Sequence, residues 1–179
     1  MRIADAGMIR PHSDAGFTIL ELVVTIVIAG ILMAVATARF VSKGGFESRG
    51  YFDEAITVVR HAQKTAIAQR RNVIVVITAD RIAVCYVAAC AAADRVIATS
   101  NLNRASGTAL ANCLNDTAWL CAGRPDGVAP VASSAATVTF DGLGRPNNAP
   151  ATITISGTES GDPTRQITIQ AETGYVSPA

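Results

Sequence analysis

Four cysteines and two histidines are the side chains of this 179-residue chain that could react covalently or bind a metal. The cysteines are Cys85, Cys90, Cys113 and Cys121, and the histidines His12 and His61 lie in other segments. Zinc sites usually place ligand cysteines two residues apart, whereas these spacings are five and eight, so we expect no metal. The thiols can pair in three ways. Two local disulfides, Cys85–Cys90 and Cys113–Cys121, are favoured over the crossed schemes, and they would fasten a loop-rich region.

The sequence contains no recognisable set of residues for acid–base or nucleophilic catalysis. No Gly-x-Ser-x-Gly, Walker or paired-carboxylate pattern occurs. Asp141 and Asp162 stand in turn-like sequence, where aspartate commonly binds backbone amides, and the ligand spacing of a calcium loop is absent. We therefore expect neither an enzyme nor a bound cofactor.

A single acid, Glu21, stands at the edge of a long apolar run. No charged residue occurs from Leu22 to Ala38, and half of the whole chain is apolar. As a helix this run measures about 25 Å, and adding residues 17–21 extends it to about 33 Å, enough to cross a bilayer of about 30 Å. The extension puts Glu21 in lipid, where a carboxylate costs about 3 kcal/mol.

Three interpretations of this N-terminus compete. A cleaved secretory signal would have a shorter apolar region followed by a small-residue cleavage site. A plain signal anchor accounts for the length but leaves Glu21 unexplained. The third interpretation uses the residues before the run, where a short polar segment ends in Gly16 and is followed by Phe17-Thr18-Ile19-Leu20-Glu21.

Gly16-Phe17-Thr18-Ile19-Leu20-Glu21 resembles the leader junction of type IV pilins and type II secretion pseudopilins. The resemblance implies that a prepilin peptidase cleaves between Gly16 and Phe17 and that the new amine of Phe17 is methylated. The absence of a side chain at Gly16 would let a protease approach closely. Residues i and i+4 share a helix face, so Phe17 and Glu21 are expected on one face. The amine of one subunit would then pair with Glu21 of a neighbour.

The later segments resemble a subfamily, the GspH/FimT-type minor pilins, and especially members similar to MshC of mannose-sensitive haemagglutinin-type pili. The similar segments are residues 62–70, which read Ala-Gln-x-x-Ala-x-Ala-Gln-Arg, Phe140-Asp141-x-x-Gly144-Arg145-Pro146, and a final hairpin with Gly174. The resemblance implies a structural subunit at or near the tip of a pilus or of a type II secretion pseudopilus. Its partners would be other pilin or pseudopilin subunits, the peptidase, the inner membrane and its assembly platform.

DNA binding is the alternative function, because some FimT-like relatives act as receptors in natural transformation through a basic C-terminal segment. Here residues 166–179 contain neither lysine nor arginine, and the net charge of the chain is only +1. Phosphate binding needs several cations, so a nucleic-acid partner is not expected. The basic residues Arg60, Lys64, Arg70 and Arg71 are more typical of a solvated helix face.

The elements expected around these residues are a long helix and a set of strands. A breaker cluster at residues 42–45 precedes an amphipathic helix from Tyr51 to about Arg71. Strands are expected at 73–77, 81–87, 95–99, 137–140, 152–155, 166–170 and 175–176, and residues 100–135 read as loop.

The predicted fold class is α+β, with a long N-terminal transmembrane and amphipathic helix packed on an antiparallel β-sheet, as in pilins. Four segments follow: a cleaved leader (1–16), a transmembrane helix (17–40), an amphipathic helix (41–71) and a β-rich domain (72–179). The expected location is the bacterial inner membrane, single-pass with the C-terminal domain in the periplasm, and then the filament. An oxidising periplasm would permit the disulfides.

Overall fold

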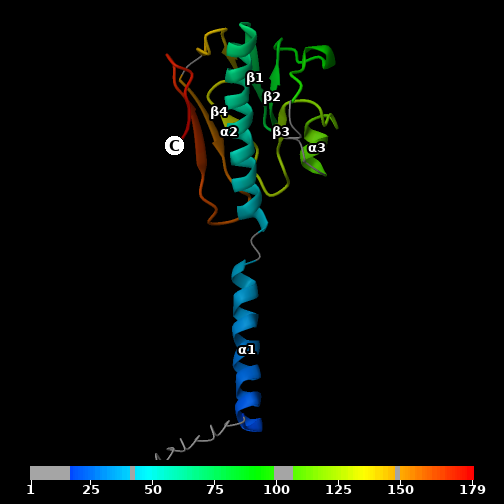
Figure 1. Cartoon of the computed structure of the whole chain (residues 1–179), viewed down its shortest axis with the longest axis vertical. Helices are drawn as coiled ribbons and strands as arrows, with labels where there is room; N and C mark the ends of the chain where they lie inside the picture. Colours follow the sequence, from blue (N-terminus) through cyan, green and yellow to red (C-terminus); the bar gives the residue numbers. More distant parts are fainter. Residues whose placement is uncertain (1–16, 41–42, 99–106, 148–149) are drawn as a thin grey trace, which may run out of the picture. The chain divides into compact units, whose positions relative to one another are not determined.

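The computed structural model describes residues 17–40, 43–98, 107–147 and 150–179. It consists of two compact units, Met1–Val41 and Ser42–Ala179, which are treated separately here. The first unit holds helix α1 (Ile19–Phe40). The second holds helix α2 (Lys43–Gln69) together with the strands (Figure 1).

Helix α1 consists mainly of apolar residues. Its side chains from Ile19 to Met33 are all exposed, and Ile19, Leu20 and Met33 are each more than 70% exposed. No helix in the described part of the chain meets the combined requirement of length and apolarity for crossing a membrane. The transmembrane helix expected at 17–40 is therefore not confirmed.

Helix α2 begins at Lys43, within the predicted segment 41–71 but before Tyr51, where its apolar periodicity was expected to start. Gly44 and Gly45 fall in its first turn, where backbone amides lack helical partners in any case, so these glycines do not stop the helix. The helix ends at Gln69 because Arg70 adopts a left-handed φ of 49°. The Arg71 amide donates to the Ala66 carbonyl and the Arg70 amide to the Ile67 carbonyl, which is the Schellman pattern of helix termination.

The strands form two antiparallel four-stranded sheets where a single sheet was predicted. The first has the order β3 (Cys121–Gly123), β2 (Arg81–Cys85), β1 (Val73–Ile77), β5 (Thr137–Phe140). The second has the order β4 (Ala132–Ser133), β6 (Ala151–Ile155), β7 (Arg165–Ile169), β8 (Val176–Pro178). Figure 1 shows α2 running along both sheets, with β1 and β2 to one side and the C-terminal strands to the other. The predicted α+β class is confirmed.

One hydrophobic core joins α2 to both sheets. The helix contributes positions spaced by three and four, including Ala55, Val59 and Ala66, which are fully buried. The strands contribute every second residue, as in the buried–half-buried alternation of β1 and β6. Each buried valine or isoleucine is worth about 1.5–3 kcal/mol relative to an exposed one, so this shared core is the main source of stability.

Two sequence predictions were wrong in the middle of the chain. The stretch expected to be loop contains α3 (Thr108–Asn112), β3 and β4. These elements are two to five residues long, too short for periodicity to reveal them. The strand expected at 95–99 is reduced to isolated bridges at Arg95 and Ile97, after a 3₁₀ turn (Ala92–Asp94), and Thr99 lies outside the described residues.

Tyr51 and Glu54, one turn apart on α2, are polar residues at the edge of this core. The Tyr51 hydroxyl and one Glu54 carboxylate oxygen are buried, and neither has a hydrogen-bond partner among the described residues. Burial raises the pKa of Glu54 to about 7, and burial, with the nearby Glu54 charge, also raises the pKa of Tyr51. Glu54 is therefore neutral in the folded state over a pH range in which it is ionised in the unfolded chain.

We predict that Glu54 makes the stability of the domain depend on pH. The proton is held more tightly in the folded state, so the contribution is complete below about pH 4.5 and is lost as the pH rises through about 7. Glu54→Gln should remove a fall of about 2–3 kcal/mol in the free energy of unfolding across this window. Urea unfolding of the detergent-solubilised chain measures it, with Trp119 as the fluorescent probe.

Asp53→Asn is the matched control, since it removes one negative charge from an exposed neighbouring position on the same helix. A Glu54→Gln variant with the pH profile of the parent chain would contradict the prediction.

Candidate functional site

The first described residues show how the motif around Phe17 starts a helix. The Thr18 hydroxyl accepts a hydrogen bond from the Glu21 amide at 3.2 Å, and the Thr18 carbonyl accepts from Leu22 at 3.1 Å. Thr18 is thus the N-cap of α1, and Glu21 occupies the third helical position. Threonine followed three residues later by glutamate is the capping-box spacing. The sequence analysis missed this role of Thr18, although the spacing could have revealed it.

Phe17 lies just before the N-cap, outside the helix. The prediction that Phe17 and Glu21 share a helix face was therefore wrong for this chain, because capping by Thr18 starts the helix after Phe17. Phe17 is 81% exposed and the Glu21 side chain is exposed. Gly16 and the predicted cleavage site lie at the boundary of the described residues, with Gly16 outside them.

This arrangement places one carboxylate beside the positive end of a helix dipole. The unpaired amides of the first turn carry a partial positive charge, which favours an acid at this position by about 0.3–1 kcal/mol. Within the described chain Glu21 forms no ion pair. Its carboxylate is therefore available to a cation supplied by another molecule.

The structure joins Cys85 to Cys90 and Cys113 to Cys121, the local pairing that the spacing favours. Cys85, Cys113 and Cys121 are buried with Ala83 and Trp119 in a second, smaller cluster. Residues 82 and 84 of β2 face the main core, whereas residues 83 and 85 face this cluster. Strand β2 is consequently covered on both sides, which explains why residues 82–85 are all buried.

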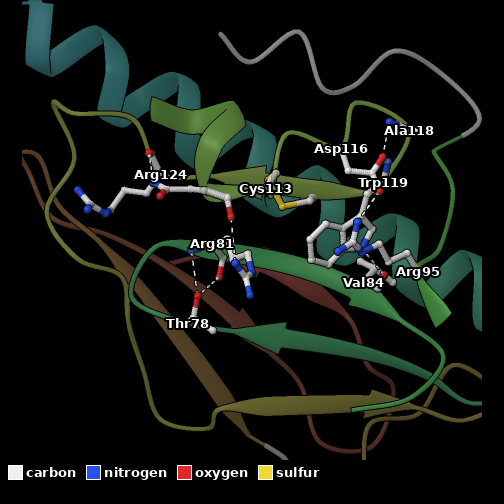
Figure 2. Close-up of a disulfide and its surroundings, with 11 residues drawn as sticks. Thr78, Arg81, Val84, Arg95, Cys113, Asp116, Ala118, Trp119 and Arg124 are labelled. Atoms are coloured by element: carbon white, nitrogen blue, oxygen red, sulfur yellow. Dashed lines mark hydrogen bonds and ion pairs between the residues drawn. A yellow bond between two sulfur atoms is a disulfide. The ribbon is translucent and has the colours of Figure 1, made fainter. Parts of the chain in front are cut away.

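Trp119 is fully buried between two arginines (Figure 2). The Arg95 guanidinium lies 4.5 Å from the Trp119 ring centroid and that of Arg81 lies 5.7 Å away. The indole nitrogen donates to the Val84 carbonyl at 2.9 Å. Arg95 is in turn paired with Asp116 at 2.7 Å, and this bond holds the pKa of the Asp116 carboxyl below its usual value. Sequence reasoning missed this cluster, since its members come from three separate segments.

Helix α3 is fastened against β3 next to this cluster. Besides the Cys113–Cys121 disulfide, Arg81 donates to the Asn112 carbonyl at 3.1 Å and the Asn112 amide donates to the Arg124 carbonyl at 2.8 Å. A Cβ at Gly123 would overlap the Ala109 carbonyl, so the backbones of α3 and β3 touch directly. The disulfide therefore closes a packed layer over β2 and β3.

Gln63 of α2 connects the turns of the two sheets. Its side-chain amide donates to the Gly144 carbonyl and to the Thr173 carbonyl, each at 3.0 Å. Gly174, with φ of +66°, packs so closely against the Gly144 carbonyl that a Cβ there would overlap it. Residues from segment 62–70, from the turn at 141–146 and from the turn before β8 thus meet at one point, which we call the Gln63 bridge.

Asp141 organises the turn that follows β5, as its position in the sequence predicts. One carboxylate oxygen accepts from the amides of Leu143 and Arg145, each at 2.8 Å. The other pairs with the Arg145 guanidinium at 3.3 Å. The backbone bond from Arg145, more than any other contact, lowers the pKa of Asp141. Asp162 likewise stands beside a turn and pairs with Arg165 at 3.5 Å.

Metal ligands do not converge in the described residues. No group of three or more histidine, cysteine or acidic side chains is arranged to hold a metal there. Two of the basic residues on and after α2 already have partners: Arg60 donates to the Val176 carbonyl and Arg71 stacks on Tyr86. Arg165, the last basic residue of the chain, donates to Ser48 and Pro163.

Comparison with known proteins gives one sequence match and several structural ones. The family described as "Prokaryotic N-terminal methylation motif" matches residues 11–37, which include Gly16, Phe17 and Glu21. No curated protein sequence matches the chain. The minor pseudopilin EpsH from the Type 2 Secretion System of Vibrio cholerae aligns with a TM-score of 0.50 and 13% identity, covering 74% of this chain and 96% of that one.

The type IV minor pilin FimU of Pseudomonas aeruginosa aligns with a TM-score of 0.48 and 13% identity, over 74% of this chain and 88% of that one. At this identity the likeness to EpsH establishes the fold alone. The chain therefore combines a pilin-like α+β fold with an N-terminal methylation motif.

We predict that the Cys113–Cys121 disulfide holds the layer over Trp119. Replacing both cysteines by alanine should lower the free energy of unfolding by about 3 kcal/mol. It should also shift Trp119 emission to longer wavelengths, because α3 is released and water reaches the indole. Replacing Cys85 and Cys90 is the comparison: it removes a link of similar loop length but leaves α3 attached, and a smaller shift is expected although Cys85 also lies in the cluster with Trp119. Equal shifts in both variants would refute this role.

We predict that Gly174→Ala is more disruptive than its backbone angle alone explains. Alanine must adopt a positive φ and also displace the Gly144 carbonyl, so a loss of about 3 kcal/mol is expected. Gly161→Ala is the matched control, since its φ is +92° but its Cβ meets open space, and about 1 kcal/mol is expected. Thermal unfolding compares the two, and equal losses would count against close packing at the Gln63 bridge.

Proposed function

We propose that this chain is a minor pilin or pseudopilin, a structural subunit that is processed, anchored and then built into a filament. A prepilin peptidase cleaves between Gly16 and Phe17, the Phe17 amine is methylated, and α1 anchors the subunit in the inner membrane. The C-terminal unit, with its β-rich part from residue 72 onward, faces the periplasm in a single-pass topology.

The observation that carries the proposal is the position of the methylation motif relative to α1. The match at residues 11–37 contains the start of a helix whose apolar side chains from Ile19 to Met33 are all exposed. Such a surface is stable only against lipid or other apolar helices. A leader segment, a capped helix start and an uncovered apolar helix are what a subunit that moves from membrane to filament requires.

Glu21 provides the specificity of assembly in this proposal. Cleavage creates a cationic amine at Phe17, and in an apolar filament core an unpaired carboxylate is costly. Pairing the Phe17 amine of one subunit with Glu21 of its neighbour offsets both desolvation costs. Since Thr18 fixes the first helical turn, the carboxylate is presented at a defined height and sets the axial register of the incoming subunit.

The motifs at 62–70, 140–146 and 174 support assignment to the GspH/FimT type, with similarity to MshC. We place the subunit at or near the tip of an MSHA-like type IV pilus or of a type II secretion pseudopilus, delivered by the inner-membrane assembly platform. DNA uptake is not favoured: Arg165 is engaged internally, and no cation follows it.

We predict that the mature protein begins with N-methylated phenylalanine at position 17. Mass spectrometry of the membrane fraction from cells with an active prepilin peptidase measures this directly. An intact Met1 terminus in such cells would refute the processing step.

We predict that Glu21→Val leaves membrane attachment unchanged but lowers incorporation into sheared filaments by at least about tenfold, because a buried amine loses its counter-charge. The Thr18→Val variant removes the N-cap of α1, at a cost of about 1 kcal/mol in helix stability, and keeps the Glu21 carboxylate. It therefore separates helix capping from charge pairing. Asp53→Asn controls for loss of a surface acid. Normal incorporation of Glu21→Val would exclude charge pairing.

A further inference from the structure

The two disulfides of the C-terminal unit differ in their access to solvent. Cys85, Cys113 and Cys121 are buried, whereas Cys90 is only partly buried. The Cys113–Cys121 bond joins the C-terminal end of α3 to β3, and the backbones of these two elements touch directly. A reagent in solution can therefore approach one bond from the side of Cys90, while the other bond becomes accessible only when α3 moves away.

Cys90 also has a strained backbone. Its φ is +50°, in the left-handed region that residues with a Cβ rarely occupy. The bond to Cys85 closes a loop with a sequence separation of only 5, inside which the Cys90 amide donates to the Val87 carbonyl at 3.0 Å. Such a conformation persists only where the surrounding structure imposes it. Opening the Cys85–Cys90 bond therefore relieves strain at Cys90.

The base of this loop is closed by backbone contacts that do not involve the disulfide. The Tyr86 amide donates to the Asp94 carbonyl at 2.8 Å, and Cys85 and Arg95 form an antiparallel bridge. The amide of the next residue, Val96, donates to β2 at 3.1 Å. The two cysteines thus remain on a closed loop when the bond between them opens, so the bond can form again without refolding of the sheet.

Arg95 supplies a cation on the Cys85 side of the bond. Side chains of residues that face each other in an antiparallel bridge lie on the same face, and Cys85 and Arg95 both pack towards Trp119. Figure 2 shows the Arg95 guanidinium beside the Trp119 ring. Its Nη1 pairs with Asp116 at 2.7 Å, but its buried Nε has no hydrogen-bond partner within the described part of the chain. A neighbouring cation stabilises a thiolate, and a stabilised thiolate leaves a disulfide faster.

We propose that Cys85 and Cys90 form a reversible redox couple that exchanges with a dithiol protein, whereas the Cys113–Cys121 bond is permanent. The site of exchange is the Cys90 sulfur, because Cys90 is the cysteine that reaches the surface. The inference goes beyond the proposed function and does not depend on it, since it concerns the folded C-terminal unit alone.

The exchange takes place in two steps. A thiolate of the dithiol attacks the Cys90 Sγ and forms a mixed disulfide, and the electron pair of the broken bond stays on the Cys85 Sγ, which leaves as a thiolate beside Arg95. The second thiol of the dithiol then loses its proton and attacks its partner sulfur, which releases Cys90. The dithiol is oxidised to a disulfide, and the cysteine pair gains two electrons and two protons.

Graded reduction of the purified full-length chain in detergent tests the difference between the two bonds. Trypsin places Cys85 and Cys90 on peptide 82–95, and Cys113 and Cys121 on peptide 105–165, because the arginines at 124 and 145 precede proline. After brief dithiothreitol treatment and alkylation, we expect peptide 82–95 to be modified at least about tenfold faster, since reduction of the other bond requires local opening. Equal rates, or faster modification of peptide 105–165, would overturn the proposal.

The same reaction in concentrated urea is the matched control. Without the fold, the two bonds close loops of similar length and should be reduced at similar rates. A difference that persists in urea would come from the local sequence, and it would reject the structural argument.

A trapping experiment identifies the sulfur that is attacked. A thioredoxin whose resolving cysteine is replaced by serine cannot complete the second step and stays attached through the mixed disulfide. We expect attachment at Cys90, which tandem mass spectrometry of peptide 82–95 distinguishes from Cys85. Attachment at any other cysteine, or no attached product, would overturn the proposal.

Two substitutions test the role of Arg95 as a positioning residue for the leaving thiolate. Arg95→Gln should slow the attachment of thioredoxin by about threefold, because the leaving thiolate loses its cation. Arg95→Lys keeps the cation and should react at the parental rate. Equal slowing in both variants, or no slowing in Arg95→Gln, rejects this role of Arg95.

Discussion

The C-terminal unit depends on one constraint: two sheets that share no strand must both bury their apolar faces on α2. Each sheet is four strands wide, and no strand of one sheet pairs with a strand of the other. The helix supplies the common apolar surface through Ala55, Val59 and Ala66, and the sheets supply alternate residues. The Gln63 bridge adds directional contacts where the turns of the sheets approach each other. Loss of helix packing would therefore separate the sheets rather than loosen one of them.

The two helices of the chain differ in the exposure of their apolar side chains. Helix α2 is amphipathic, and its apolar face is covered within the molecule. Helix α1 is apolar on all sides and exposed from Ile19 to Met33. Changes in the core of the C-terminal unit should therefore affect the folding of that unit.

The elements that the sequence predicted correctly are those with strong, repeated patterns. The β-branched run at 73–77 and the alternating residues at 151–155 and 165–169 form strands within one residue of the predicted limits. The short elements between residues 107 and 133 could not be predicted, because Cys121–Gly123 becomes a strand only through pairing with β2. Thr18 could have been identified from its spacing to Glu21. The Trp119 cluster could not, since Arg95, Asp116 and Val84 approach it only in the folded chain.

Three of the four edge strands contact a neighbouring group, and the fourth is very short. The Val176 carbonyl of β8 is taken by Arg60, the amide and carbonyl of Thr139 in β5 are taken by Asn147, and β3 is covered by α3. Strand β4 is only two residues long. Uncapped edges are the usual starting points for amyloid-like stacking between molecules. These contacts leave little free edge on which a second molecule could add a strand, so the folded C-terminal unit is protected from cross-β aggregation.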